Sequence, residues 1–251
     1  MGVVCTSNSR PPMDSFADSV RVAFDLVVHG DARLWSVVGL SLAVSACACA
    51  LAAGFGLAAG ALLAVARFRA RRVVLAVLNT LLALPSVVVG LVVYLLLSRS
   101  GPLGSLGLLF TPTAMVVAQT VLVVPVVAAL TRQALQGTWR DHGEQLLSLG
   151  ASRSQAAAWL LWDERFAVLT VLLAAFGRAI SEVGAVMIVG GNIEGHTRVM
   201  TTAIALETSK GDLPQALGLG MVLLGVVLVL NLAIAALRAH RGGGGEALAH
   251  D

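Results

Sequence analysis

Long apolar blocks separated by short polar segments dominate the chain. A helix needs on the order of 20 residues to cross a hydrocarbon core of about 30 Å. Most of the blocks meet or approach that length, and they predict about five spans, over residues 34–66, 73–97, 114–130, 167–189 and 217–237. We therefore expect an all-α, polytopic membrane protein with about five transmembrane helices.

The composition agrees with this interpretation. Hydrophobic residues make up 57% of the chain and charged residues only 12%, about half the charged share of a globular domain. A mean hydropathy of +0.88 excludes a disordered chain. The three cysteines are an odd number, and Cys47 and Cys49 lie inside an apolar block, which argues against a disulfide framework.

The basic residues predict the orientation in the membrane, because cytoplasmic loops are enriched in Lys and Arg. The densest cluster, residues 67–72, should be cytoplasmic, and alternation then places residues 132–165 and the C-terminal tail inside. The inner segments hold ten Arg, whereas the outer segments hold six basic residues. The net charge of +3 is thus a topology signal in a multi-pass protein of the cell (inner) membrane, and no nucleic-acid partner is expected.

Three parts follow from this pattern. Residues 1–33 form an external segment, in which Phe16, Val20, Phe24, Val27 and Val28 recur at helical spacing. This spacing indicates either an amphipathic helix in the outer interface or a packed extension of the first span. Residues 34–238 form the transmembrane domain, and residues 239–251, with four consecutive glycines, form a flexible cytoplasmic tail.

Prolines and glycines inside the spans predict a packed bundle or an oligomer. Pro85 and Pro125 each remove one helical hydrogen bond and favour a kink, which neighbouring helices must shield. Gly90, Gly177 and Gly184 would allow helices to approach closely.

The inner loop over residues 132–165 is predicted to form a helical hairpin. Thr138 suits the start of a first helix and Gly150 suits a left-handed stop, while Ser152 and Gln155 have the spacing of a capping box for a second helix. Leucines near Gly150 and charged residues around them form an apolar strip rimmed by charge. The hairpin is either a simple connector or a surface on which a partner docks.

Two charges interrupt the fourth span. Arg178 and Glu182 are one helical turn apart in an otherwise apolar segment, and an isolated charge at the bilayer centre costs about 3 kcal/mol on insertion scales. They must therefore face the bundle interior or water. They form either a structural ion pair or a gate in a pathway.

A polar, glycine-rich segment follows over residues 190–202. It contains Asn192, His196, Arg198, Thr201 and Thr202, which can donate hydrogen bonds to an anion. The alternative is a solvated outer loop. Its glycine spacing imitates a phosphate-binding loop, but the lysine is missing and the segment should lie outside the cell, away from ATP.

The segment EQLLSLGAS, from Glu144 to Ser152, resembles the glutamate-to-glycine motif in permeases of binding-protein-dependent ABC importers. Gln145 and Leu146 depart from the usual alanines, and Trp162 and Asp163 from the usual Leu-Pro. The resemblance implies a type I importer fold in which this hairpin fits a groove of the ATPase. It assigns ATPase coupling to Glu144, Leu147, Gly150 and Ala151.

The later motifs, from Arg178 through the GGNIEGHTR segment to Gly211, resemble the oxyanion branch of these importers. Tungstate permeases are the most similar, with molybdate and sulfate permeases next, and the likeness covers roughly residues 35–235. It implies a homodimer of permeases, a cytoplasmic ABC ATPase dimer and an external substrate-binding protein. It also implies a translocation pathway formed by Arg178, Glu182, Asn192, His196, Arg198, Thr201 and Thr202.

The sequence supplies no phosphate loop with its lysine, no paired-carboxylate site and no metal-ligand cluster. We therefore expect no enzymatic activity and no bound cofactor, with ATP used by the partner subunit. Two other classes stay open: an ion-coupled secondary transporter, which usually has internal repeats that are not evident here, and a membrane scaffold that only recruits a partner.

Overall fold

A computed structural model describes residue 21 and residues 32–246, so the expected amphipathic helix around residues 16–28 lies outside the described part. The described residues contain helices and turns and no strand, which agrees with the all-α prediction. The helices are α2 (Ala32–Val65), α3 (Arg71–Leu82), α4 (Ser86–Leu97), a 3-10 turn (Gly104–Leu106), α5 (Pro112–Ser148), α6 (Arg153–Asp163), α7 (Arg165–Ile180), α8 (Gly184–Gly190), α9 (Met200–Lys210) and α10 (Leu213–Glu246).

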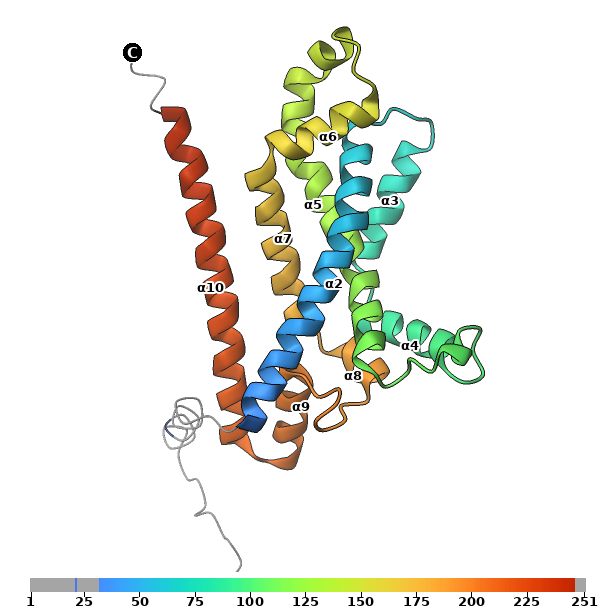
Figure 1. Ribbon diagram of the computed structural model, residues 1–251, viewed down its shortest axis with the longest axis vertical. Helices are drawn as coiled ribbons and strands as arrows, with labels where there is room; N and C mark the ends of the chain where they lie inside the picture. Colours follow the sequence, from blue (N-terminus) through green and yellow to red (C-terminus); the bar gives the residue numbers. More distant parts are fainter. Residues whose placement is uncertain (1–20, 22–31, 247–251) are drawn as a thin grey trace, which may run out of the picture.

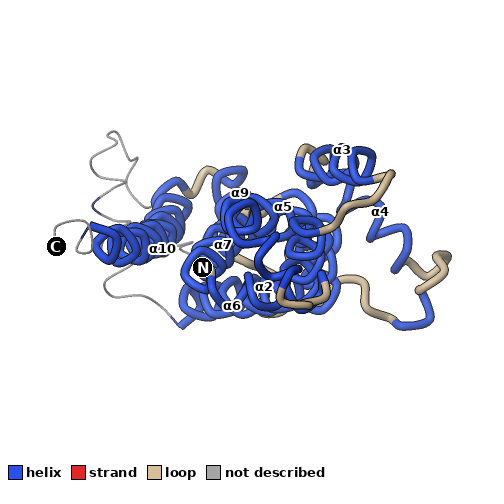
Figure 2. The backbone as a smooth tube through the Cα atoms, turned by 90° about the horizontal axis from the view of Figure 1, so that it is seen from above, coloured by secondary structure: helices blue, strands red, loops and turns tan. Residues whose placement is uncertain are grey.

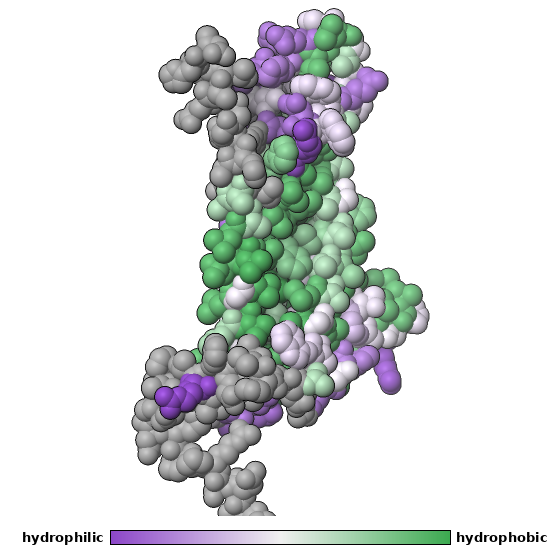
Figure 3. Space-filling view, turned by 60° about the vertical axis from the view of Figure 1, so that its left-hand side comes forward, coloured by the Kyte–Doolittle hydropathy of each residue, from purple (hydrophilic) through white to green (hydrophobic). Residues whose placement is uncertain are grey.

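Three of the described helices, α2, α5 and α10, are each long and apolar enough to cross a membrane. Two further spans exist if the bent pairs α3–α4 and α7–α8 each count as one, which makes up to five. The prediction of about five spans is therefore confirmed. Figure 3 shows the apolar band that these helices form between two polar ends.

The helices α2 and α5 form the centre of the bundle, and α7 packs against both (Figure 1). Seen from above in Figure 2, α10 lies at one end of an elongated arrangement and α3 and α4 at the other. The apolar span of α10 is only 6% buried. Much of α10 therefore presents apolar side chains to lipid or to another protein, including Leu224, Leu228, Val229 and Leu232.

Two glycines allow α2 and α5 to approach closely. A Cβ atom at Gly56 would lie 2.7 Å from Val127 Cβ, and one at Gly60 would lie 2.5 Å from the carbonyl oxygen of Ala128. Small residues four apart are a common device for close helix packing in membranes. These glycines were not singled out in the sequence, whereas Gly90 and Gly184 are confirmed as close contacts and Gly177 has open space.

The second predicted span is broken, because α3 and α4 meet at 96°. Pro85 stands immediately before α4 and has no N–H to continue the hydrogen-bond ladder, and the residue before a proline avoids helical geometry. The kink predicted here is therefore a full change of direction. Pro125, in contrast, lies buried within the continuous helix α5.

The fourth predicted span is also not one straight helix. It ends as α7 at Ile180 and resumes as α8 at Gly184, with a bend of 58°. Residues 181–183 therefore lie in a turn. Arg178 is in the last turn of α7, and Glu182 lies in the break itself.

The segments that the charge pattern assigns to the same side of the membrane lie at the same end of the bundle (Figure 1). The loop after α2, the turn between α5 and α6 and the end of α10 lie at one end, and α9 with the loops beside it lies at the other. The helix α10 continues to Glu246, into the segment assigned to the tail.

One prediction for the inner hairpin is wrong. Thr138 does not begin a helix, since α5 runs without interruption from Pro112 to Ser148. The residues around Thr138 include helix formers such as Gln, Ala, Leu and Glu, and no proline interrupts them. The hydroxyl of Thr138 instead donates a hydrogen bond to the carboxylate of Glu164, 2.5 Å away.

Candidate functional site

The inner hairpin turns at Gly150, which has φ +84°. The amide of Gly150 donates to the carbonyl of Leu147 (3.0 Å) and the amide of Ala151 donates to that of Leu146 (3.1 Å). This pair of bonds is the Schellman arrangement, which satisfies the last carbonyls of a helix and needs a left-handed residue. The left-handed stop predicted at Gly150 is confirmed.

The second arm of the hairpin begins with the predicted capping box. The amide of Gln155 donates to the Ser152 hydroxyl (3.3 Å), and the amide of Ser152 donates to the Gln155 side chain (2.8 Å). Both ends of the turn are therefore fixed by local hydrogen bonds, so the hairpin has a defined shape without a partner.

Both arms of the hairpin expose large apolar side chains, Leu147 and Leu149 near the turn and Trp159 and Trp162 along α6. Leu149 is 85% exposed and Trp162 is 74% exposed, and Leu147 and Trp159 are also exposed. Glu144 is also exposed, one helical turn before Leu147 on α5. An apolar patch rimmed by charge is typical of a protein interface, so the hairpin has the surface expected of a docking element.

The hairpin is tied to the transmembrane helices at two points. Arg153 donates to the carbonyl of Val65, at the end of α2 (2.5 Å), and Thr138 donates to Glu164 at the junction of α6 and α7. A buried apolar cluster, which includes Leu135 and Leu160, joins α2, α5 and α6. A displacement of the hairpin would therefore be carried into α2, α5 and α7.

The two helix breaks lie against each other in the outer half of the bundle. A Cβ at Gly90 of α4 would lie 2.7 Å from the Cα of Ala185 in α8, and a Cβ at Gly184 would lie 2.8 Å from the Ser86 hydroxyl. Irregular backbone at membrane depth is tolerated where it is buried in protein or lines a water-filled cavity. This junction of α4 and α8 is closely packed and buried, so it meets the first of these conditions.

Arg178 and Glu182 meet at this junction. Arg178 Nη1 donates to Glu182 Oε2 at 2.7 Å, and the other carboxylate oxygen of Glu182 accepts from the amide of Ala185 (3.3 Å). The side chain of Arg178 is 47% exposed and that of Glu182 only 4%. The pair is thus formed, and its cationic half faces out of the single chain.

The loop between α8 and α9 is held by a buried threonine. Thr197 donates to the carbonyl of Gly190 (2.6 Å) and accepts from the amide of Ile193 (2.9 Å). Arg198 pairs with Glu194 (3.4 Å), and its buried Nε has no hydrogen-bond partner in the described part of the chain. The loop is therefore fixed by internal hydrogen bonds, while residues 193–196 at its tip are exposed.

The predicted pathway residues of this loop separate into two groups. Thr201 donates to the carbonyl of Glu182 (2.8 Å), and Thr202 accepts from the amide of Val199 (3.1 Å), so both hydroxyls serve the fold. Asn192 is partly buried with φ +51° and donates to the carbonyl of Thr202 (3.4 Å). His196 is exposed, and in the sequence it lies beyond α8 from the Arg178–Glu182 pair.

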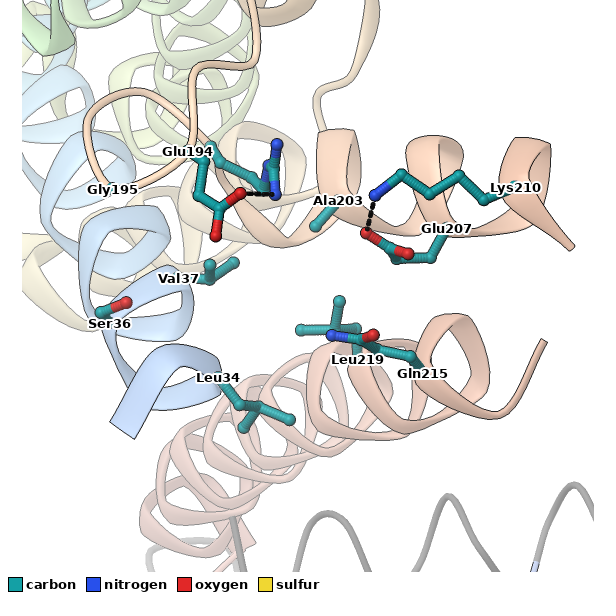
Figure 4. A pocket seen from close by; sticks show the side chains of 11 residues that line it. Leu34, Ser36, Val37, Glu194, Gly195, Ala203, Glu207, Lys210, Gln215 and Leu219 are labelled. Atoms are coloured by element: carbon teal, nitrogen blue, oxygen red, sulfur yellow. Dashed lines mark hydrogen bonds and ion pairs between the residues drawn. The ribbon is translucent and has the colours of Figure 1, made fainter. Parts of the chain in front are cut away.

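A hollow opens at the outer end between the start of α2, α9 and α10 (Figure 4). Its wall carries two ion pairs, Arg198 with Glu194 and Lys210 with Glu207 (2.9 Å). Each cation there is already matched by a carboxylate. Arg178 is likewise matched by Glu182, so ion pairing does not separate these cations as candidates for contact with an anion.

Sequence reasoning missed one buried polar residue close to the Arg178–Glu182 pair. Gln119 of α5 is buried and donates to the carbonyl of Ala179 (3.1 Å), while its own carbonyl oxygen has no partner within the described residues. It was detectable as an isolated amide in the apolar block over residues 114–130.

Among the described residues, no cluster of three or more His, Cys, Asp or Glu could hold a metal ion.

Comparison with known protein families gives one match that covers most of the chain. Residues 55–241 match the binding-protein-dependent transport system inner membrane component family. The matched region begins within α2 and extends along α10, so it includes the hairpin and both helix breaks.

Individual proteins are similar over nearly the whole chain. The tungstate uptake system permease protein TupB of Peptoclostridium acidaminophilum is 42% identical over 90% of this chain and 99% of that protein. TupB of Campylobacter jejuni is 34% identical over 87% of this chain and 92% of that protein. The sulfate transport system permease protein CysW of Synechocystis is 27% identical over 85% of this chain and 80% of that protein.

Proposed function

Because the chain belongs to the family of binding-protein-dependent transport system inner membrane components, we propose that it is the tungstate-conducting permease of an ABC importer. Membership makes it the permease component of an ABC transporter in the inner membrane. Such a permease is not an enzyme, and the family implies a separate ATPase subunit and a substrate-binding protein. ATP is bound by that ATPase subunit, and this chain itself binds no cofactor.

The choice of tungstate depends on one observation. Two tungstate permeases are 42% and 34% identical to this chain, whereas the sulfate permeases are 27–30% identical. A permease that is 43% identical is described only as one for an anion. Molybdate, which has the same charge and shape as tungstate, is the second candidate.

The substrate is tested with the purified permease, its ATPase and its binding protein in lipid vesicles. We expect tungstate to stimulate ATP hydrolysis and to accumulate in the vesicles at lower concentrations than molybdate, with sulfate weakest. Stimulation by sulfate at the same concentration as tungstate would contradict the proposal. Accumulation without ATP would indicate a secondary transporter, and no accumulation at all would indicate a scaffold.

The hairpin is the point at which the ATPase acts. Its exposed apolar side chains near Glu144 and Gly150 provide the docking surface, together with Leu147 and Ala151. Its ties through Arg153 and Thr138 pass movement to the spans. Closure of the ATPase subunits then shifts the bundle between inward-open and outward-open states.

Two copies of the chain form the pathway. Arg178 lies near the outer end of a transmembrane helix and is half exposed in the single chain, and a lipid-facing arginine is costly. A second copy across this face would enclose Arg178 in an aqueous passage, where it attracts a dianion. Asn192, His196 and Arg198 lie on its outer approach, and Thr201 and Thr202 support that loop and the gate of Arg178 and Glu182 through their hydrogen bonds.

We expect Arg178→Gln to lower the uptake rate about tenfold or more, because the passage loses its nearest cation. Glu182→Gln should also lower uptake, since Glu182 holds Arg178 in position. The measurement is anion uptake by vesicles that contain equal amounts of assembled complex. Arg99→Gln, in the exposed segment after α4, is the matched control and should transport normally.

The double variant R178Q/E182Q separates the gate from a structural ion pair. It removes both charges, so a purely structural pair would be replaced by two neutral side chains at little cost. Full uptake by the double variant would reduce the pair to a structural role. Continued loss of uptake in a complex that assembles normally supports the pathway.

A further inference from the structure

A hollow lined by arginines lies at the inner end of the bundle, where the loop after α2 meets α5. Arg67, Arg71 and Arg140 line it, together with Gln136 and Trp139. Among the described residues around the hollow none is acidic, and no ion pair within the described part of the chain engages these arginines. The hollow therefore carries a concentrated positive charge that the described residues do not neutralise.

Arg71 is held in place and still has a donor to offer. Its Nη2 donates to the carbonyl of Leu63, near the end of α2 (3.3 Å). Its Nε is buried and has no hydrogen-bond partner among the described residues. A buried donor without a partner is unfavourable, and an anionic oxygen in the hollow would satisfy it.

An apolar groove follows the same three helices toward the middle of the membrane. Its walls come mainly from α2, α3 and α5, with Leu84 and Val89 closing its far end, and almost all of its lining is apolar. On α2, Leu63 of the groove adjoins Ala64 of the hollow, and on α3, Val74 of the groove follows Arg71 by one turn. Val77 and Val121 in the groove are about half exposed. The groove thus leads from the basic hollow along α2, α3 and α5 toward the apolar middle of the bundle.

We propose that the hollow and the groove together bind an anionic phospholipid, with its phosphate among the arginines and an acyl chain along α3. Guanidinium groups bind phosphate oxygens in pairs of hydrogen bonds. Basic pockets between helices on the cytoplasmic side suit anionic headgroups, and a tryptophan at that level suits the membrane interface. The lipid braces α3, which has few other neighbours, against α2 and α5.

The headgroup is tested by native mass spectrometry of the full chain in detergent, with phosphatidylglycerol and phosphatidylcholine of the same acyl chains. We expect R67Q/R140Q to bind phosphatidylglycerol about 30-fold more weakly than the unaltered protein, equivalent to ~2 kcal/mol. Arg71 is left unchanged because it also caps α2. The matched control is R69Q/R72Q, which removes two exposed charges that do not line the hollow.

The acyl chain is tested by filling the groove. Val121→Trp should weaken phosphatidylglycerol binding about tenfold while all arginines remain, and Leu228→Trp on the exposed face of α10 should have no effect. Inorganic phosphate and glycerol phosphate are added as competitors. If they bind the hollow as tightly as the lipid does, and Val121→Trp changes nothing, the ligand is a free phosphate and not a lipid.

Two other results would overturn the lipid site. Equal binding of phosphatidylglycerol and phosphatidylcholine would show that the hollow does not recognise an anionic headgroup. An equal loss of phosphatidylglycerol binding in R67Q/R140Q and R69Q/R72Q would show the same. If R67Q/R140Q instead loses the ATPase subunit on purification but keeps the lipid, the arginines contact that protein. Lipid binding is measured on the permease alone, so it is independent of which anion the transporter carries.

Discussion

Replacement of Gly150 by valine is expected to lower the amount of anion transported per ATP hydrolysed by about tenfold or more. Gly150 has φ +84°, a conformation that a β-branched residue adopts only with strain. A Cβ atom there would meet nothing within 4 Å, so crowding is not the cause. The strained turn would change the orientation of Leu149 and α6. Movement of the ATPase would then no longer be transmitted to the transmembrane helices.

The measurement records uptake and hydrolysis in the same vesicles. Gly150→Asn is the first control, because asparagine tolerates the left-handed conformation and should retain most of the coupling. Gly137→Val is the second, because it adds the same side chain at an open position of α5 where φ is not left-handed. Failure of Gly150→Val to bind the ATPase would also support docking. An unchanged transport ratio in an assembled complex would show that the hairpin does not couple.

The positions of the spans could be predicted from the sequence, but their directions could not. Apolar blocks locate α2 and α5 because each must be long enough to cross the bilayer. Hydropathy does not report the direction of a helix, so the 96° bend between α3 and α4 and the 58° bend between α7 and α8 could not be predicted from it. Pro85 signalled the first bend, whereas residues 181–183 contain no proline to signal the second.

The local parts of the site were predictable, and the long-range parts were not. Gly150 and the Ser152 capping box depend on neighbouring residues, so their sequence signals were sufficient. Thr138 has the right residue type for a cap, yet its partner is Glu164, 26 positions away. In the same way, Gln119 bonds to Ala179 only because α5 and α7 pack together. Such contacts depend on tertiary packing, which a single sequence does not reveal.

Replacement of Gly60 by leucine is expected to destabilise the protein by at least ~3 kcal/mol and to lower its unfolding temperature in detergent by about 6 °C or more. A Cβ atom at Gly60 would lie 2.5 Å from the carbonyl oxygen of Ala128 and 2.8 Å from Thr131 Cβ. The first obstacle is backbone, so no rotamer change can relieve it. The helices α2 and α5 would have to separate, and the apolar clusters between them would open.

The matched control is Gly54→Leu, on the same helix. Gly54 is exposed and a Cβ atom there would meet nothing within 4 Å, so the same substitution should change stability by about 0.5 kcal/mol or less. Both variants add the same apolar side chain and remove the same glycine from a helix, so intrinsic helix propensity cancels in the comparison. The difference between them measures the close approach of α2 and α5. Equal unfolding temperatures would mean that the two helices do not pack through Gly60. Movement of the hairpin would then have to reach the junction of α4 and α8 by contacts other than those between α2 and α5.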